Sequence, residues 1–214
     1  MRITRLFFLL LTSTVYYATA QERINSFSSV VTINQDATLD VQETIEVIST
    51  GKTVVHGIVR EFPTTYRDHL GTTYRVDFSV KSVRRNNTPE PFTLKSADNG
   101  QLLYIGDKKV TIPTGKHRYT ITYRTNRQLG FFKEYDELYW NISGTGWRLP
   151  IDSVEATINL PTKALSAEAY TGKQGAKKKD YSYSIQNNHA KKNLEEVFIH
   201  LIDESKKTEG TSHE

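Results

Sequence analysis

The stretch that decides the fold is ATLDVQETIEV, residues 37–47, in which apolar side chains occupy the odd positions and polar ones the even positions. Successive side chains of a β-strand point to opposite faces of its sheet, so this alternation predicts a strand with one buried and one solvated face. Glu43 is the exception, because it places a carboxylate in the apolar register. The stretch therefore predicts a strand that carries an unusual acid toward the core.

The same period of two recurs along most of the chain, at residues 74–81, 118–124, 154–160 and 181–185. Turn-forming pairs such as Asn86-Asn87 separate these segments, and Asn99-Gly100 is the strongest hairpin signal. No window of eleven or more residues has convincing helical periodicity. We therefore expect an all-β fold, an antiparallel β-sandwich of about ten strands, immunoglobulin-like or jelly-roll-like.

The N-terminus has the order of parts of a secretory signal peptide. Arg2 and Arg5 precede an apolar run at residues 6–11, and Ala18-Thr19-Ala20 forms a small-residue cleavage site. The alternative, an N-terminal membrane anchor, is disfavoured because the apolar run is too short to span a bilayer. We expect a signal peptide at 1–20, a β-sandwich ectodomain at 21–203 and a polar disordered tail at 204–214. The mature chain is then exported, and is periplasmic, extracellular or on the outer side of a membrane.

The amino-acid composition limits the kinds of catalysis, metal site and partner that this chain can have. The chain has 214 residues and no cysteine, which excludes thiolate catalysis, Cys-ligated zinc and iron–sulfur clusters. Without Arg2 and Arg5 the basic residues fall from 28 to 26 against 24 acidic ones, so the formal charge falls from +4 to +2. This balance provides no basic face for phosphates, and nucleic acid is not expected as a partner.

Residues 131–147, FFKEYDELYWNISGTGW, hold both tryptophans of the chain and a dense group of rings and acids. Two interpretations stay open. The run can form a ledge on which sugar rings stack, while carboxylates accept hydrogen bonds from hydroxyl groups. It can instead pack in the core, with Trp140 buried and an acid accepting backbone N–H bonds. The candidate binding residues are Asp136, Glu137, Tyr139, Trp140 and Trp147.

Glu43 needs a partner if it faces the core, because an isolated buried charge is strongly unfavourable. Arg60 lies in the next strand-like segment, and its guanidinium can contact a carboxylate at two points. We therefore predict a structural ion pair between Glu43 and Arg60. The alternative is a β-bulge that rotates Glu43 into water.

Catalytic patterns are not apparent. Glu134, Asp136 and Glu137 lie within four residues of one another, so they cannot flank a sugar on opposite sides as a glycosidase requires. The six histidines are scattered without zinc-binding spacing, and no Gly-x-Ser-x-Gly elbow is present. We expect a protein that is not an enzyme, with no catalytic residues, no metal and no cofactor.

Four stretches carry a resemblance to a known family: Val41-x-Glu43-x-Ile45, GIVREFP at 57–63, Gly115 with Tyr119-x-Ile121-x-Tyr123, and DELYWN at 136–141 followed by Gly144 and Trp147. The chain resembles the N-terminal extracytoplasmic domain of the predicted membrane proteins called domain of unknown function 2207. The resemblance implies an exported β-rich ectodomain, usually followed by transmembrane helices, with no established enzymatic activity. The chain departs from the family in lacking a cysteine pair and a membrane segment. It is either a shortened relative or ends before the anchor.

These observations favour an exported, non-catalytic β-sandwich ectodomain that acts as an envelope interaction or sensing module. Its partner would be a protein or a glycan of the cell envelope, with membrane association possible through a segment missing from this chain. The alternative is a carbohydrate-binding module that uses the aromatic ledge Tyr139–Trp147.

Overall fold

The computed structural model describes residues 21–67, 71–133, 135–161, 164–170, 182–186, 189–193 and 198–203. The predicted signal peptide and polar tail lie outside the described residues. Every regular element in the described ranges is a strand, which confirms the all-β prediction. None of these residues forms a helix with the length and hydropathy needed to cross a bilayer.

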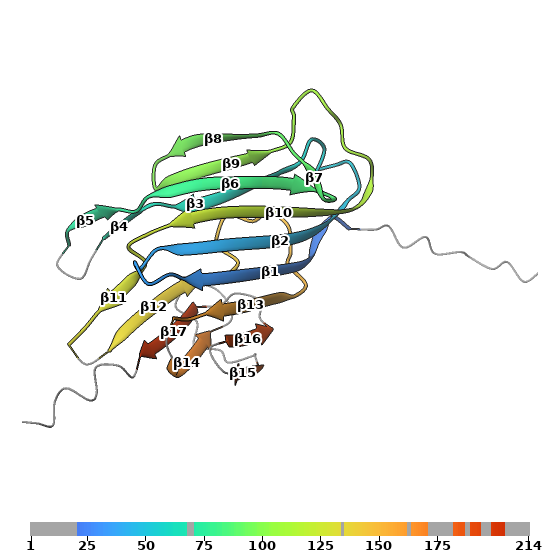
Figure 1. Ribbon diagram of the computed structural model, residues 1–214. Coiled ribbons are helices and arrows are strands. Elements are labelled where there is room, and N and C mark those ends of the chain that lie inside the picture. The colour runs from blue at the N-terminus through green and yellow to red at the C-terminus, as the bar shows by residue number, and fades with distance from the viewer. Residues whose placement is uncertain are drawn as a thin grey trace, which may run out of the picture.

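The largest sheet has eight strands, and its long central strands run across the molecule (Figure 1). Their order is β15 (Ser182–Gln186), β16 (His189–Asn193), β13 (Val154–Asn159), β1 (Arg23–Ile33), β2 (Leu39–Ser49), β10 (Gly115–Thr125), β6 (Phe78–Arg85) and β7 (Thr88–Pro89). All neighbours are antiparallel except β1 and β13, which are parallel with Phe27 opposite Val154. The antiparallel prediction is wrong for this pair, because the chain passes through another sheet after β10 and returns beside β1 in the same direction.

Smaller sheets form a second layer. A four-stranded sheet has the order β11 (Leu129–Phe131), β12 (Asp136–Asn141), β17 (Phe198–Asp203) and β14 (Ala164–Tyr170). A three-stranded sheet has the order β3 (Ile58–Pro63), β9 (Gly100–Ile105) and β8 (Phe92–Ala97). A two-stranded ribbon pairs β4 (Thr65–Arg67) with β5 (Thr73–Arg75). The described residues form 17 strands, more than the ten predicted, and four of them (β4, β5, β7 and β11) have only two or three residues. The segment predicted as one strand at 74–81 is interrupted at Val76 and Asp77, and the Asp77 N–H donates to the Asn126 side chain at 2.8 Å.

The core lies between the layers. Alternate residues of β2 are buried while their neighbours keep partial contact with solvent, as the sequence pattern predicts. From the second layer, Phe62 of β3 places its ring 4.8 Å from that of Tyr123 on β10. Leu138 of β12 joins the same apolar cluster. Each large apolar side chain buried in this way contributes roughly 1.5–3 kcal/mol.

Two predicted hairpin turns are present. Asn86 and Asn87 have φ values of 51° and 69°, the left-handed conformation that a two-residue turn between β6 and β7 requires. The predicted Asn99-Gly100 hairpin joins β8 and β9, but Gly100 is already paired with Ala97, so the turn lies one residue earlier. A Cβ on Gly100 would lie 2.1 Å from the Phe62 carbonyl oxygen, so only glycine fits against β3 at this point.

Candidate functional site: an aromatic groove beside a buried ion pair

The predicted ion pair is present. Arg60 on β3 donates from Nε to Glu43 Oε2 at 2.9 Å and from Nη2 to Glu43 Oε1 at 2.8 Å. Both side chains are buried, with 3% of Arg60 and 1% of Glu43 exposed. Glu43 stays in register with Ser29 on one side and Ile121 on the other, so no bulge turns it to water. The pair links the large sheet to the second layer.

The remaining polar atoms of this pair also have internal partners. The Tyr123 hydroxyl donates to Glu43 Oε1 at 3.0 Å, and Arg60 Nη1 donates to the Glu61 carbonyl oxygen at 2.8 Å. Burial raises the pKa of Tyr123 well above its ordinary value, so the hydroxyl stays a neutral donor. Burial opposes the charge of Arg60, but the Glu43 carboxylate outweighs that effect and raises the Arg60 pKa. The charges of Glu43 and Arg60 therefore pair with each other, and their hydrogen-bonding atoms already have partners within the protein.

Aromatic rings enclose the Arg60 guanidinium. Its central carbon lies 4.7 Å from the ring centroid of Phe62 and 5.7 Å from those of Phe27 and Trp147. The Trp147 indole N–H donates to the Ser143 carbonyl oxygen at 2.8 Å. Trp147 thus packs against the ion pair and does not line the groove described below.

Two glycines bring the chain after β12 against Arg60 and its neighbour. Gly144 and Gly146 have φ values of 72° and 83°. A Cβ on Gly144 would lie 2.0 Å from Arg60 Nη1, and one on Gly146 would lie 2.4 Å from Glu61 Oε2. This structural role was not predicted from the sequence. The available signal was the Gly-Thr-Gly spacing directly before Trp147.

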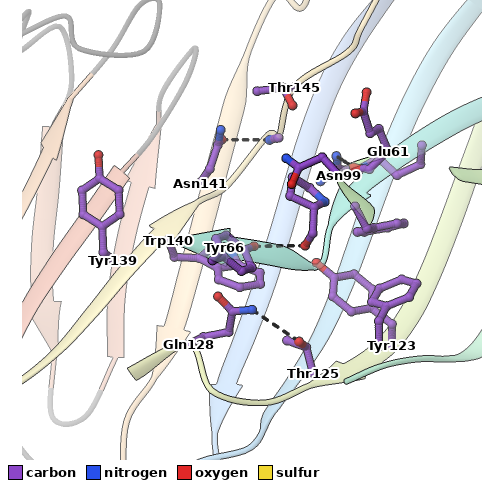
Figure 2. A pocket seen from close by; sticks show the side chains of 15 residues that line it. Glu61, Tyr66, Asn99, Tyr123, Thr125, Gln128, Tyr139, Trp140, Asn141 and Thr145 are labelled. Atoms are coloured by element: carbon purple, nitrogen blue, oxygen red, sulfur yellow. Dashed lines mark hydrogen bonds between the residues drawn. The ribbon is translucent and has the colours of Figure 1, made fainter. Parts of the chain in front are cut away.

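A groove of about 530 Å³ opens beside this cluster (Figure 2). Segments from both layers line it. The rings are those of Phe62, Tyr66, Phe78, Tyr123 and Trp140, with Tyr139 at one side, and the polar lining side chains include Glu61, Asn99, Thr125, Gln128, Asn141 and Thr145. The lining combines an apolar floor with several hydrogen-bonding groups, the combination found in most small-ligand sites.

The structure separates the predicted ledge. Leu138 of β12 is buried, Tyr139 is 55% exposed, and Trp140 is partly buried against the core. Consecutive strand residues face opposite ways, so Tyr139 and Trp140 lie on opposite faces of β12, and Figure 2 shows Tyr139 to one side of the other labelled rings. Asp136 and Glu137 are partly buried on the same strand and do not line the groove. Of the five candidates, Tyr139 and Trp140 line the groove, and of these two Trp140 is the one packed against the core.

Trp140 has a further distinguishing feature. Its indole nitrogen is buried, and it has no hydrogen-bond partner among the described residues. An unsatisfied buried N–H costs about 1–3 kcal/mol, so such a group in a native site needs an explanation. A bound acceptor that reached this N–H would satisfy it.

Most groove residues were not predicted from the sequence. Tyr66 donates to the Pro63 carbonyl oxygen at 3.0 Å, and burial raises its pKa. Gln128 Nε2 donates to Thr125 Oγ1 at 3.5 Å. These residues lie on loops and very short strands distant in sequence, where no local pattern marks them. In the described residues, no three His, Asp or Glu side chains are grouped as a metal site would need.

The family model of the predicted membrane protein (DUF2207) N-terminal domain matches residues 23–200. The chain belongs to this family. It is 26% identical over 161 residues to the uncharacterized protein YciQ of Escherichia coli K12, a match that covers 72% of this chain and 25% of YciQ. The chain therefore spans about a quarter of the length of that relative.

Solved structures share the fold. Native yeast LTA4 hydrolase is similar with a TM-score of 0.55 and 10% sequence identity, over 85% of this chain and 29% of the enzyme. A yeast LTA4 hydrolase structure in complex with bestatin gives a TM-score of 0.54 and 11% identity, with the same coverage. At this identity the likeness shows the fold alone.

Proposed function

We propose that this domain is a non-catalytic recognition module of the cell envelope, exported across the membrane, and that it binds its partner in the aromatic groove. The single observation that carries the proposal is the groove itself, about 530 Å³, which is lined by six aromatic rings, several amide and hydroxyl groups and the Glu61 carboxylate. Specific ligand sites commonly occupy about 300–1,000 Å³ and have this mixed lining. Membership of a predicted membrane protein family supports a place at the envelope.

The ion pair bears on what the groove binds. Arg60 and Tyr123 line it, yet their polar atoms are engaged by Glu43 and the Glu61 backbone. An anionic ligand that paired with Arg60 would have to displace these buried contacts at a high energetic cost. The groups left for a ligand are rings, amides, hydroxyls and the Glu61 carboxylate, which favour a polar ligand without negative charge. The buried pair would hold the groove rigid, which lowers the entropy that binding must overcome.

A second, narrower candidate is carbohydrate binding. Tyr66 and Trp140 offer ring surface beside the amides of Asn99, Gln128 and Asn141. The C–H faces of a sugar pack on aromatic rings, while its hydroxyls pair with amides. The buried Trp140 N–H would find an acceptor in a sugar oxygen. This retains the carbohydrate hypothesis but moves the site from the Tyr139–Trp147 ledge to the groove.

Arrays of neutral glycans and of peptides, probed with residues 21–214, test both proposals. We expect a glycan hit that is lost in Trp140→Ala and in Gln128→Ala. Tyr104→Ala is the matched control, since this tyrosine is 38% exposed on β9 and does not line the groove. Peptide hits that are lost in the same variants would support the groove and reject carbohydrate. Hits that survive both groove substitutions would reject the groove as the recognition site.

A further inference from the structure

Two adjacent phenylalanines lie exposed at the tip of a β-hairpin. The hairpin joins β11 to β12, with Phe131 opposite Asp136, and the Phe132 N–H donates to the Tyr135 carbonyl oxygen at 2.9 Å. Phe131 is 63% exposed and Phe132 is 46% exposed. Isolated exposed apolar residues are ordinary, whereas neighbouring aromatic residues at a projecting turn mark a contact surface. Lys133 follows them directly in the sequence.

The last described strand ends beside this hairpin. β17 is antiparallel to β12, with Glu137 opposite Ile202, so Asp203 lies next to the first residues of β12. β14 begins at the same end, since Ala164 pairs with Asp203. In Figure 1 the tip of β17 lies close to the start of β12. Eleven residues follow Asp203 in the sequence, so the chain continues from the end of the domain that carries the two phenylalanines.

We propose that the hairpin tip, Phe131 to Lys133, inserts into the surface of a lipid bilayer and orients the domain on it. Aromatic rings and lysine are the side chains that favour the interface between headgroups and acyl chains. The chain belongs to a family described as predicted membrane proteins, and the matched relative is about four times as long as the matched part. A membrane-attached chain that leaves the domain at Asp203 would direct this tip toward the bilayer.

The size of the tip favours lipid over a protein partner. A phenylalanine ring buries at most about 150–250 Å², so two rings fall well short of the roughly 1,000 Å² that a specific protein interface needs. Insertion into lipid has no such minimum area, and a tethered domain needs only a weak contact to set its orientation. Neither phenylalanine lines the groove, so the proposal is independent of the proposed function.

Fluorescence with brominated lipids tests the proposal. Residues 21–214 carrying a C-terminal histidine tag are tethered to vesicles of phosphatidylethanolamine, phosphatidylglycerol and a nickel-chelating lipid, so that the chain is attached beyond Asp203. In Phe131→Trp, brominated acyl chains should quench the added tryptophan. Phe92→Trp is the matched control, because Phe92 is 42% exposed on β8 of another sheet. The signal of the two native tryptophans is subtracted with the unsubstituted protein.

Stronger quenching at position 131 than at position 92 supports lipid insertion. Equal quenching at the two positions overturns it. As a second measurement, the double variant Phe131→Ser/Phe132→Ser should lower the fraction of untagged protein that floats with the same vesicles, while Phe92→Ser/Leu94→Ser should not. Urea unfolding of each variant excludes a folding defect. An unchanged floating fraction, or no flotation of the unsubstituted protein, counts against the proposal.

Discussion

Replacing Arg60 by methionine while leaving Glu43 in place tests the structural basis of the site. The substitution keeps a long apolar side chain but removes both guanidinium contacts to the carboxylate, at 2.9 and 2.8 Å. Glu43 is then a buried acid with the Tyr123 hydroxyl as its remaining side-chain partner. Breaking a buried pair from one side costs about 3–5 kcal/mol, because the other charge is left uncompensated. We therefore expect Arg60→Met to lower the free energy of unfolding by about 3–5 kcal/mol at pH 7.

Urea unfolding followed by tryptophan emission measures this effect. Arg118→Met is the matched control, because Arg118 pairs with Glu46 through a side chain that is 55% exposed. That surface pair is worth at most about 1 kcal/mol. Glu43→Met/Arg60→Met should recover most of the lost stability, since it leaves no unpaired charge. If Arg60→Met costs no more than Arg118→Met, the buried pair does not stabilise the fold and the reasoning is refuted.

Two further predictions concern the loops. Burial alone would raise the pKa of Glu22, but hydrogen bonds from Thr50, Thr53 and the Lys52 backbone outweigh it and lower the pKa to about 2. Glu22 therefore contributes at most about 3 kcal/mol to stability, and roughly 1–2 kcal/mol after solvent screening. This contribution is present above pH 4.5 and is lost as the pH falls toward 2, so the stability difference between the unsubstituted protein and Glu22→Gln should vanish in acid. A difference that does not change with pH would contradict this prediction. Gly144→Ala should lower the free energy of unfolding by at least about 2 kcal/mol more than Gly51→Ala, as measured by thermal unfolding. The two glycines have a similar φ, but only a Cβ at position 144 would clash with Arg60. Equal losses of stability would show that the close approach to Arg60 is unimportant.

The residue alternation of β2 was sufficient to predict the strand, its buried face and the need of Glu43 for a partner. A buried carboxylate needs an oppositely charged partner, and Arg60 in the next strand-like segment could therefore be predicted as the partner of Glu43. The parallel pairing of β13 with β1 could not be predicted in this way. Alternation reports which face of a strand is buried, but it carries no information about which strand lies beside it.

The residues that line the groove could not be predicted from local sequence patterns for the same reason. Tyr66 lies on β4, Asn99 lies in the turn between β8 and β9, and Gln128 lies between β10 and β11, so these residues come together only because separate sheets meet at that point. The aromatic ledge, by contrast, conflicts with the period of two that predicted the rest of the fold. Tyr139 and Trp140 are consecutive on a strand, so they face opposite sides.

The central claim is that a ligand binds in the groove beside Trp140, and the two tryptophans of the chain make a direct measurement possible. Trp147→Phe leaves Trp140 as the single reporter, and Trp140→Phe leaves Trp147. Addition of a ligand identified on the arrays should shift the emission of the Trp140 reporter and protect it from acrylamide. The Trp147 reporter should change little, because its ring packs on Arg60 outside the groove. A response confined to Trp147, or saturable binding that leaves Trp140 emission unchanged, would contradict the account.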